Sequence, residues 1–100
     1  MKDIKYIQTV PFPDINEPVE NFSFDCVCTA GTFNFHFKWL NDRWNVWVTL
    51  PNGEVREAGV YPNVISWTGF TDYGLVFKSS LKAIDFKSLL LAEITLIKWK

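Results

Sequence analysis

The sequence contains few of the residues that usually carry chemistry. It has one histidine, His36, and two cysteines, Cys26 and Cys28, among 100 residues. The acidic residues in or beside its proline-containing loop, Pro11 to Pro18, are Asp14, Glu17 and Glu20. This cluster lacks calcium-loop spacing and fits a solvated loop. Catalysis usually needs a group that titrates near neutral pH, a nucleophile with its base, or a metal. We therefore expect no enzyme and no catalytic, metal-binding or cofactor-binding residues.

The chain also lacks a strong charge and a long apolar run. Ten basic and eleven acidic residues leave a net charge of −1, whereas nucleic-acid binding usually needs a basic face. No stretch approaches the roughly 20 apolar residues of a membrane span. Residues 1–10 show no signal-peptide apolar run. We expect no nucleic-acid specificity, no membrane association, and synthesis and folding in a cytoplasm.

The two cysteines point to structure rather than reactivity. Cys26 and Cys28 are two residues apart in a predicted strand and should share one face. Their Cα atoms would then lie about 6.6 Å apart, so a disulfide would be strained. We interpret them as free, buried thiols of a reducing compartment. A Cys–His pair is not favoured, because the cysteines share their face with Phe22 and Phe24, whereas His36 lies on a polar face.

Aromatic residues, in contrast, are abundant at 17% of the chain. They alternate with polar residues, which is typical of β-strands with one buried face. The clearest stripe is Phe33, Phe35, Phe37 and Trp39, and a second is Trp44, Val46, Val48 and Leu50. The predicted strands are Ile4–Val10, Asn21–Cys28, Phe33–Trp39, Trp44–Leu50, Val55–Val60, Leu75–Lys78 and Ala92–Trp99.

Turn residues connect these segments into hairpins. Gly31 lies in a predicted turn over residues 29–32, and a second turn covers residues 41–43. Asn52-Gly53 predicts a third turn of type I′ or close to it. Together these turns predict an antiparallel meander from Phe22 to Val60.

Two segments leave alternatives open. Residues 64–67 fit a short strand or irregular structure. Residues 79–91 fit a short helical turn near residues 80–90 or an irregular excursion. The whole chain predicts one all-β domain over residues 1–100, an antiparallel barrel or sandwich of six to seven short strands.

An aromatic-rich β domain without catalytic groups suggests binding. Trp47 alternates away from the second stripe, and Trp67 lies in an interrupted region. Exposed tryptophans indicate interaction surfaces. The candidates for contact with a partner are Trp47, Trp67, Phe70 and Tyr73. A module that binds carbohydrate or another protein is therefore one interpretation.

The order of motifs resembles a known family. A short strand and a proline-containing loop precede the aromatic strands, and NDRWNVWVTL at residues 41–50 precedes Asn52-Gly53. The return strand ends in Ala58-Gly59-Val60, and apolar strands follow. This arrangement resembles the small baseplate plug proteins of contractile-tailed phages and prophages, best over residues 22–60. The segment SSLKAIDFKSLL at residues 79–90 departs from the Gly-rich, acidic turns of that family.

The resemblance implies a structural role at the hub of a phage or prophage tail. The protein would seal the central channel and contact hub and spike proteins, or associate with itself. It would reside in the virion, at the tail baseplate, after synthesis in the cytoplasm of a bacterial host. The family brings no catalytic residues to this chain.

Overall fold

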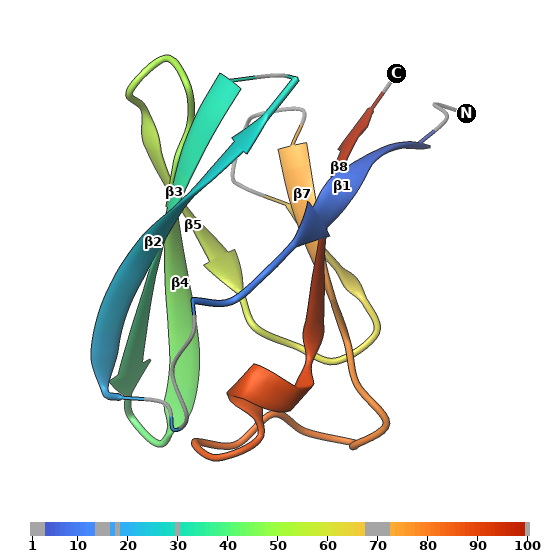
Figure 1. The fold of residues 1–100 in the computed structure, drawn as a ribbon. Helices are drawn as coiled ribbons and strands as arrows, with labels where there is room; N and C mark the ends of the chain where they lie inside the picture. Colours follow the sequence, from blue (N-terminus) through green and yellow to red (C-terminus); the bar gives the residue numbers. More distant parts are fainter. Residues whose placement is uncertain (1–3, 14–16, 18, 30, 68–72, 100) are drawn as a thin grey trace.

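The chain folds into two antiparallel sheets packed face to face, as Figure 1 shows. The computed structural model describes residues 4–13, 17, 19–29, 31–67 and 73–99. Its elements are β1 (Ile4–Val10), β2 (Asn21–Cys28), β3 (Gly31–Leu40), β4 (Arg43–Thr49), β5 (Val55–Gly59), β6 (Ile65–Trp67), β7 (Tyr73–Lys78), the 3₁₀ helix η1 (Leu89–Leu91) and β8 (Glu93–Trp99). The all-β prediction is confirmed, and the architecture is a sandwich rather than a closed barrel.

The first sheet, here called the meander sheet, has the strand order β2-β3-β4-β5. Each strand pairs with the next one along the chain, so the predicted meander is confirmed. The alternation of side chains explains the register. Phe33, Phe35 and Phe37 all face the core and are 0% exposed, whereas the polar residues between them are only half-buried.

The turn chemistry differs from the sequence prediction at one hairpin. Asn41 and Asp42 have φ of 54° and 60° in a two-residue loop, the geometry of a type I′ turn. At the next hairpin Gly53 has a positive φ of 91° and Asn52 does not, so the type I′ prediction for Asn52-Gly53 is wrong. Pro51 has no N–H and cannot close a two-residue loop.

The hairpin closes one residue earlier instead. The Leu50 N–H donates to the Glu54 carbonyl at 2.7 Å, and the Gly53 N–H donates to the Leu50 carbonyl at 2.9 Å. This pattern is a three-residue loop with glycine in the left-handed position. Pro51 also reaches the neighbouring hairpin, because a Cβ placed on Gly31 would lie 2.7 Å from the Pro51 Cβ.

The second sheet, here called the terminal sheet, has the strand order β1-β8-β7-β6. It joins the first and last strands of the chain, and both chain ends lie on the same side of the molecule in Figure 1. A bulge shifts the β1 register between Tyr6 and Gln8. Residues 65–67 form a short strand, so of the two structures considered for residues 64–67 the strand is the one observed. β7 begins at Tyr73, two residues before the predicted Leu75. These eight strands exceed the six to seven expected.

The core lies between the two sheets. The phenylalanines of β3 meet Leu75 and Phe77 of β7 and Ile94 and Leu96 of β8, all 0% exposed. The Phe37 and Phe77 rings meet edge to face, with centroids 6.1 Å apart. Burying one such side chain contributes about 1.5–3 kcal/mol, so this layer dominates the stability of the fold.

Residues 79–91 close one end of the sandwich. The Trp44 indole Nε1 donates to the Asp85 carbonyl at 3.0 Å, and the Phe86 ring stacks on Trp44 at 5.4 Å. Asp85 and Ser88 exchange hydrogen bonds, with the Asp85 N–H donating to Ser88 Oγ and the Ser88 N–H donating to Asp85 Oδ1. This pair precedes η1, so the segment forms a short helical turn at residues 89–91.

The buried phenylalanine layer generates a stability prediction. Phe35→Ala should lower the free energy of unfolding by about 3–5 kcal/mol, because it removes packed ring atoms and leaves a cavity. Val27→Ala is the control, because Val27 lies in the same sheet but is 74% exposed. Urea unfolding followed by tryptophan fluorescence measures both variants. A loss below about 1 kcal/mol for Phe35→Ala would contradict the assigned core.

Candidate protein-binding surface

Trp47 lies on the outer face of the meander sheet. It is half-buried, while its neighbours Val46 and Val48 point into the core. The register places it between His36 of β3 and Glu57 of β5, and Ser23 of β2 ends the same row. The outward position inferred from alternation is therefore confirmed for Trp47.

The side chains around Trp47 are mostly polar. The Lys38 Nζ lies 5.4 Å from the centroid of the Trp47 ring, a cation–π distance. Asn45 and Thr49 flank Trp47 along β4 on the same face. An aromatic ring bordered by hydrogen-bonding groups can contact a partner through apolar area and polar contacts together.

The other three candidates do not gather around Trp47. Tyr73 belongs to the opposite sheet, where its ring meets Phe33 edge to face at 5.1 Å, at the border of the core. The Lys98 Nζ lies 5.2 Å from the Tyr73 ring centroid. The Trp67 side chain and the whole of Phe70 lie outside the described residues.

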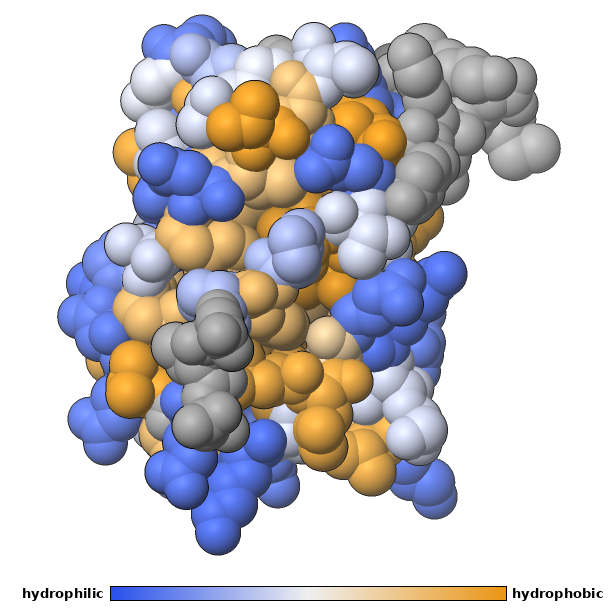
Figure 2. Space-filling model, viewed as in Figure 1, coloured by the Kyte–Doolittle hydropathy of each residue, from blue (hydrophilic) through white to orange (hydrophobic). Residues whose placement is uncertain are grey.

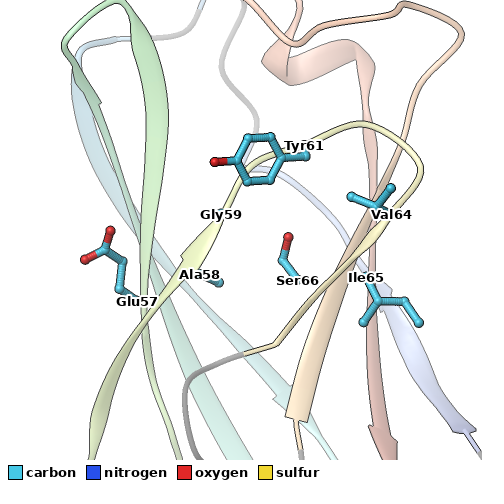
Figure 3. A pocket seen from close by; sticks show the side chains of 7 residues that line it. All are labelled: Glu57, Ala58, Gly59, Tyr61, Val64, Ile65 and Ser66. Atoms are coloured by element: carbon cyan, nitrogen blue, oxygen red, sulfur yellow. The ribbon is translucent and has the colours of Figure 1, made fainter.

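A groove lies where the edge strands of the two sheets, β5 and β6, approach each other (Figure 3). It is a cavity of about 420 Å³, within the usual range of ligand-binding pockets. Its lining residues are Glu57, Ala58, Gly59, Tyr61, Val64, Ile65 and Ser66. Three of them are apolar or aromatic and well exposed, namely Tyr61 at 53%, Val64 at 51% and Ile65 at 39%.

Tyr61 forms one wall of this groove because Gly59 leaves room for it. The tyrosine ring packs directly on the Gly59 backbone, where an added Cβ would lie 2.8 Å from the ring Cδ2. Figure 3 shows the ring over this part of β5 and the Ser66 hydroxyl pointing into the space beside it. A glycine on an edge strand is commonly covered by an aromatic ring in this way.

The opposite side of the sandwich, between β1 and β2, is closed by side chains. Gln8 Nε2 donates to the Cys26 Sγ at 2.9 Å, which bridges the two edges. The Phe12 ring packs against Phe22 and Phe24 at centroid distances of 6.5 and 5.9 Å. The two sides of the sandwich therefore differ, since one is filled from within the chain and the other carries a groove.

A further apolar patch lies at the closed end of the sandwich. Leu91 of η1 is 79% exposed and Leu81 is 45% exposed. Figure 2 shows hydrophobic side chains gathered low on this face, in the region of η1. Exposed apolar area of this kind is typical of surfaces that meet other molecules.

The cysteines and the histidine do not form a reactive pair. Cys26 faces the core side of β2, whereas His36 lies on the outer face, where its Nε2 contacts the Asn21 side-chain oxygen. Burial raises the pKa of the Cys26 thiol, and the neighbouring Cys28 raises this pKa further, against the opposing Gln8 hydrogen bond. Both cysteines are free and Cys26 is buried, as expected, whereas Cys28 is only half-buried. A buried thiol with a raised pKa is a poor nucleophile at neutral pH.

The acidic residues of the proline loop do not gather into a site in the described structure. Glu17 and Glu20 are exposed, and Asp14 lies outside the described residues. Within the ranges described, no group of three or more His, Cys, Asp or Glu side chains is arranged to hold a metal ion. In the same ranges no helix has the length and apolar character needed to span a membrane.

Sequence reasoning missed the groove residues Tyr61, Val64 and Ile65. The Tyr61-Pro62-Asn63 segment reads as a chain break, and nothing local reveals that β5 and β6 end at neighbouring edges. The available signal was the pair of apolar residues, Val64 and Ile65, directly after this break.

Comparisons with protein-family models, curated proteins and solved structures found no match.

The raised pKa of Cys26 generates a testable pH dependence. In a Cys28→Ser variant, iodoacetamide should alkylate folded Cys26 more slowly than the urea-unfolded chain, with its pH midpoint above the usual thiol value of about 8.5. The folded state holds this proton more tightly, so Cys26 ionisation lowers stability only as pH rises above that value. The Cys26→Ser variant is the control, because Cys28 is then the thiol that iodoacetamide alkylates. A folded midpoint at or below the unfolded one would contradict burial as the cause.

Proposed function

We propose that the chain is a structural, non-enzymatic component of the tail baseplate of a phage or prophage. In this role it seals the hub channel and binds hub and spike proteins, or a second copy of itself. The baseplate location rests on the sequence resemblance over residues 22–60. In this role the protein resides in the virion after its synthesis in the cytoplasm of the host.

The observation that best supports a role in an assembly is the exposed pair of sheet edges. β5 and β6 each end a sheet, and the groove between them carries exposed Tyr61, Val64 and Ile65. An edge strand without a paired neighbour among the described residues is a liability in a free monomer, and so are exposed apolar side chains such as Tyr61 and Val64, but both suit a subunit that neighbours cover. The outer-face Trp47 and the Leu91 patch add further contact area for neighbouring subunits.

The positions of the titratable groups support a structural role. His36 and Cys26 lie on opposite faces of the meander sheet, and Cys26 is buried. Nucleophilic catalysis needs such a pair within hydrogen-bond distance. The pleat of the strands thus holds the Cys26 thiol and the His36 imidazole apart.

Tail particles test the baseplate proposal directly. Contractile tails purified from the bacterium that encodes this chain should contain it, and antibody labelling should locate it at the hub end. The neighbouring genes should encode tail-tube, sheath and hub proteins. Intact tails that contain hub and spike proteins but lack this chain would contradict the proposal.

The polar surroundings of Trp47 favour one second candidate, a module that binds carbohydrate or another protein. Aromatic faces next to hydrogen-bonding side chains suit amphipathic ligands such as sugars. Under the baseplate proposal, a glycan array should show no binding that depends on Trp47. Trp47→Ala and Trp67→Ala are compared with Thr49→Ala, which alters the same face as Trp47 without removing a ring. Glycan binding lost in a tryptophan variant and kept in Thr49→Ala would support the second candidate.

A further inference from the structure

The groove between β5 and β6 has the features of a site that accepts a β-strand. We propose that an extended segment of a partner protein pairs with the β5 edge, with a basic side chain opposite Glu57 and an apolar side chain opposite Ala58. The proposal rests on the function proposed above and specifies the chemistry of the partner. Addition of a strand to a sheet edge is a common mode of peptide recognition.

The geometry of β5 provides a template for alternating side chains. Glu57 lies on the outer face of the sheet, in the row of Trp47, whereas Ala58 points toward the interior opposite Val46. In Figure 3 the Ala58 side chain points toward the β6 side of the groove and Glu57 points to the other side. An added strand would therefore direct one side chain outward beside Glu57 and the next one into the groove.

The inner position favours an apolar side chain. Ala58 is small and lines the groove, and its 4% exposure shows that it already packs against the core, so a side chain opposite it would meet an apolar surface. Val64 borders the same groove from the β6 side and is exposed, whereas Ile65 lies on the outer face of β6, since its neighbour Ser66 is the buried one. An apolar side chain inserted into the groove would remove the exposed area of Val64 from water, which contributes roughly 25 cal/mol for each Å² buried.

The outer position favours a basic side chain. Arg56 and Glu54 on the same hairpin pair with each other, with Arg56 Nη2 at 2.7 Å from Glu54 Oε2. Glu57 forms no ion pair with any basic side chain of the described residues. Its carboxylate is thus an uncompensated negative charge at the edge of the sheet. A lysine or arginine directly opposite it would form a favourable cross-strand pair.

Charge also argues against a second copy as the occupant of this edge. Antiparallel pairing of β5 with its own copy over all five residues would be centred on Glu57. The two Glu57 carboxylates would then lie directly opposite each other, and like charges in that position destabilise a sheet. A different polypeptide with a basic residue avoids this repulsion.

A random octapeptide display library tests the proposal on the purified protein. The wild type should select peptides in which lysine or arginine alternates with apolar residues. Backbone amide signals of residues 57–59 and 64–66 should shift in NMR spectra when a selected synthetic peptide is added. A selected pool without this alternation, or shifts confined to other strands, would overturn the proposal.

Substitutions at Glu57 distinguish recognition of a charged side chain from non-specific peptide binding. Glu57→Gln should weaken binding of the selected peptide about fivefold, and Glu57→Lys should weaken it more and select acidic peptides instead. Glu20→Lys is the matched control, because Glu20 is also exposed but lies beside β2 at the opposite edge of the same sheet. Equal effects of Glu57→Lys and Glu20→Lys would overturn the assignment of the basic position.

Other occupants of the groove give distinct results. A concentration-dependent dimer in gel filtration that Val64→Lys abolishes would identify a second copy and overturn the partner strand. If tails contain the chain but hub binding is unchanged by Glu57→Lys, this inference fails while the proposed function stands. If the peptide results hold and tails lack the chain, the proposed function fails and the strand-binding edge stands.

Discussion

Phe33, Phe35 and Phe37 on β3 form the contact on which the rest of the structure depends. Their rings have no exposure to solvent, and they pack against Leu75, Phe77, Ile94 and Leu96 of the other sheet. Because successive side chains in a strand point to opposite faces, fixing these three rings inward also fixes His36 and Lys38 outward. The outer surface around Trp47 is therefore a direct consequence of the buried stripe.

The same constraint explains which parts of the fold were predictable from sequence. The meander depends on local signals, namely alternating aromatic residues and turn residues at Gly31, Asn41-Asp42 and Gly53, and these lie close together in the chain. The pairing of β1 with β8 joins residues at opposite ends of the sequence, and no local pattern encodes it. The bulge after Tyr6 also interrupts the alternation, so side-chain positions along β1 did not follow from a strict period of two.

The candidate surface was predictable to a similar degree. The outward position of Trp47 follows from the alternation of side chains within one strand, and the sequence alone shows that alternation. The groove depends on which strands become edges and on how closely those edges approach, and these are properties of the complete sandwich. Tyr61 could not have been placed without knowing that its ring covers Gly59. The turn at residues 51–53 was also not predictable from Asn52-Gly53 alone. Pro51 has no N–H, so the hydrogen bond that closes the hairpin forms at Leu50, one residue earlier.

The contact between Gly31 and Pro51 links two hairpin loops that are separate in sequence. Gly31 has no room for a side chain here, since a methyl group on it would collide with the proline ring. The backbone also disfavours a side chain at position 31, because Gly31 has a φ of 123°. A substitution there would therefore need both a different backbone conformation and a displaced loop at position 51. For engineering, this end of the sandwich is a poor place for inserted tags. The Asn41-Asp42 loop, with both residues exposed, offers a less constrained alternative.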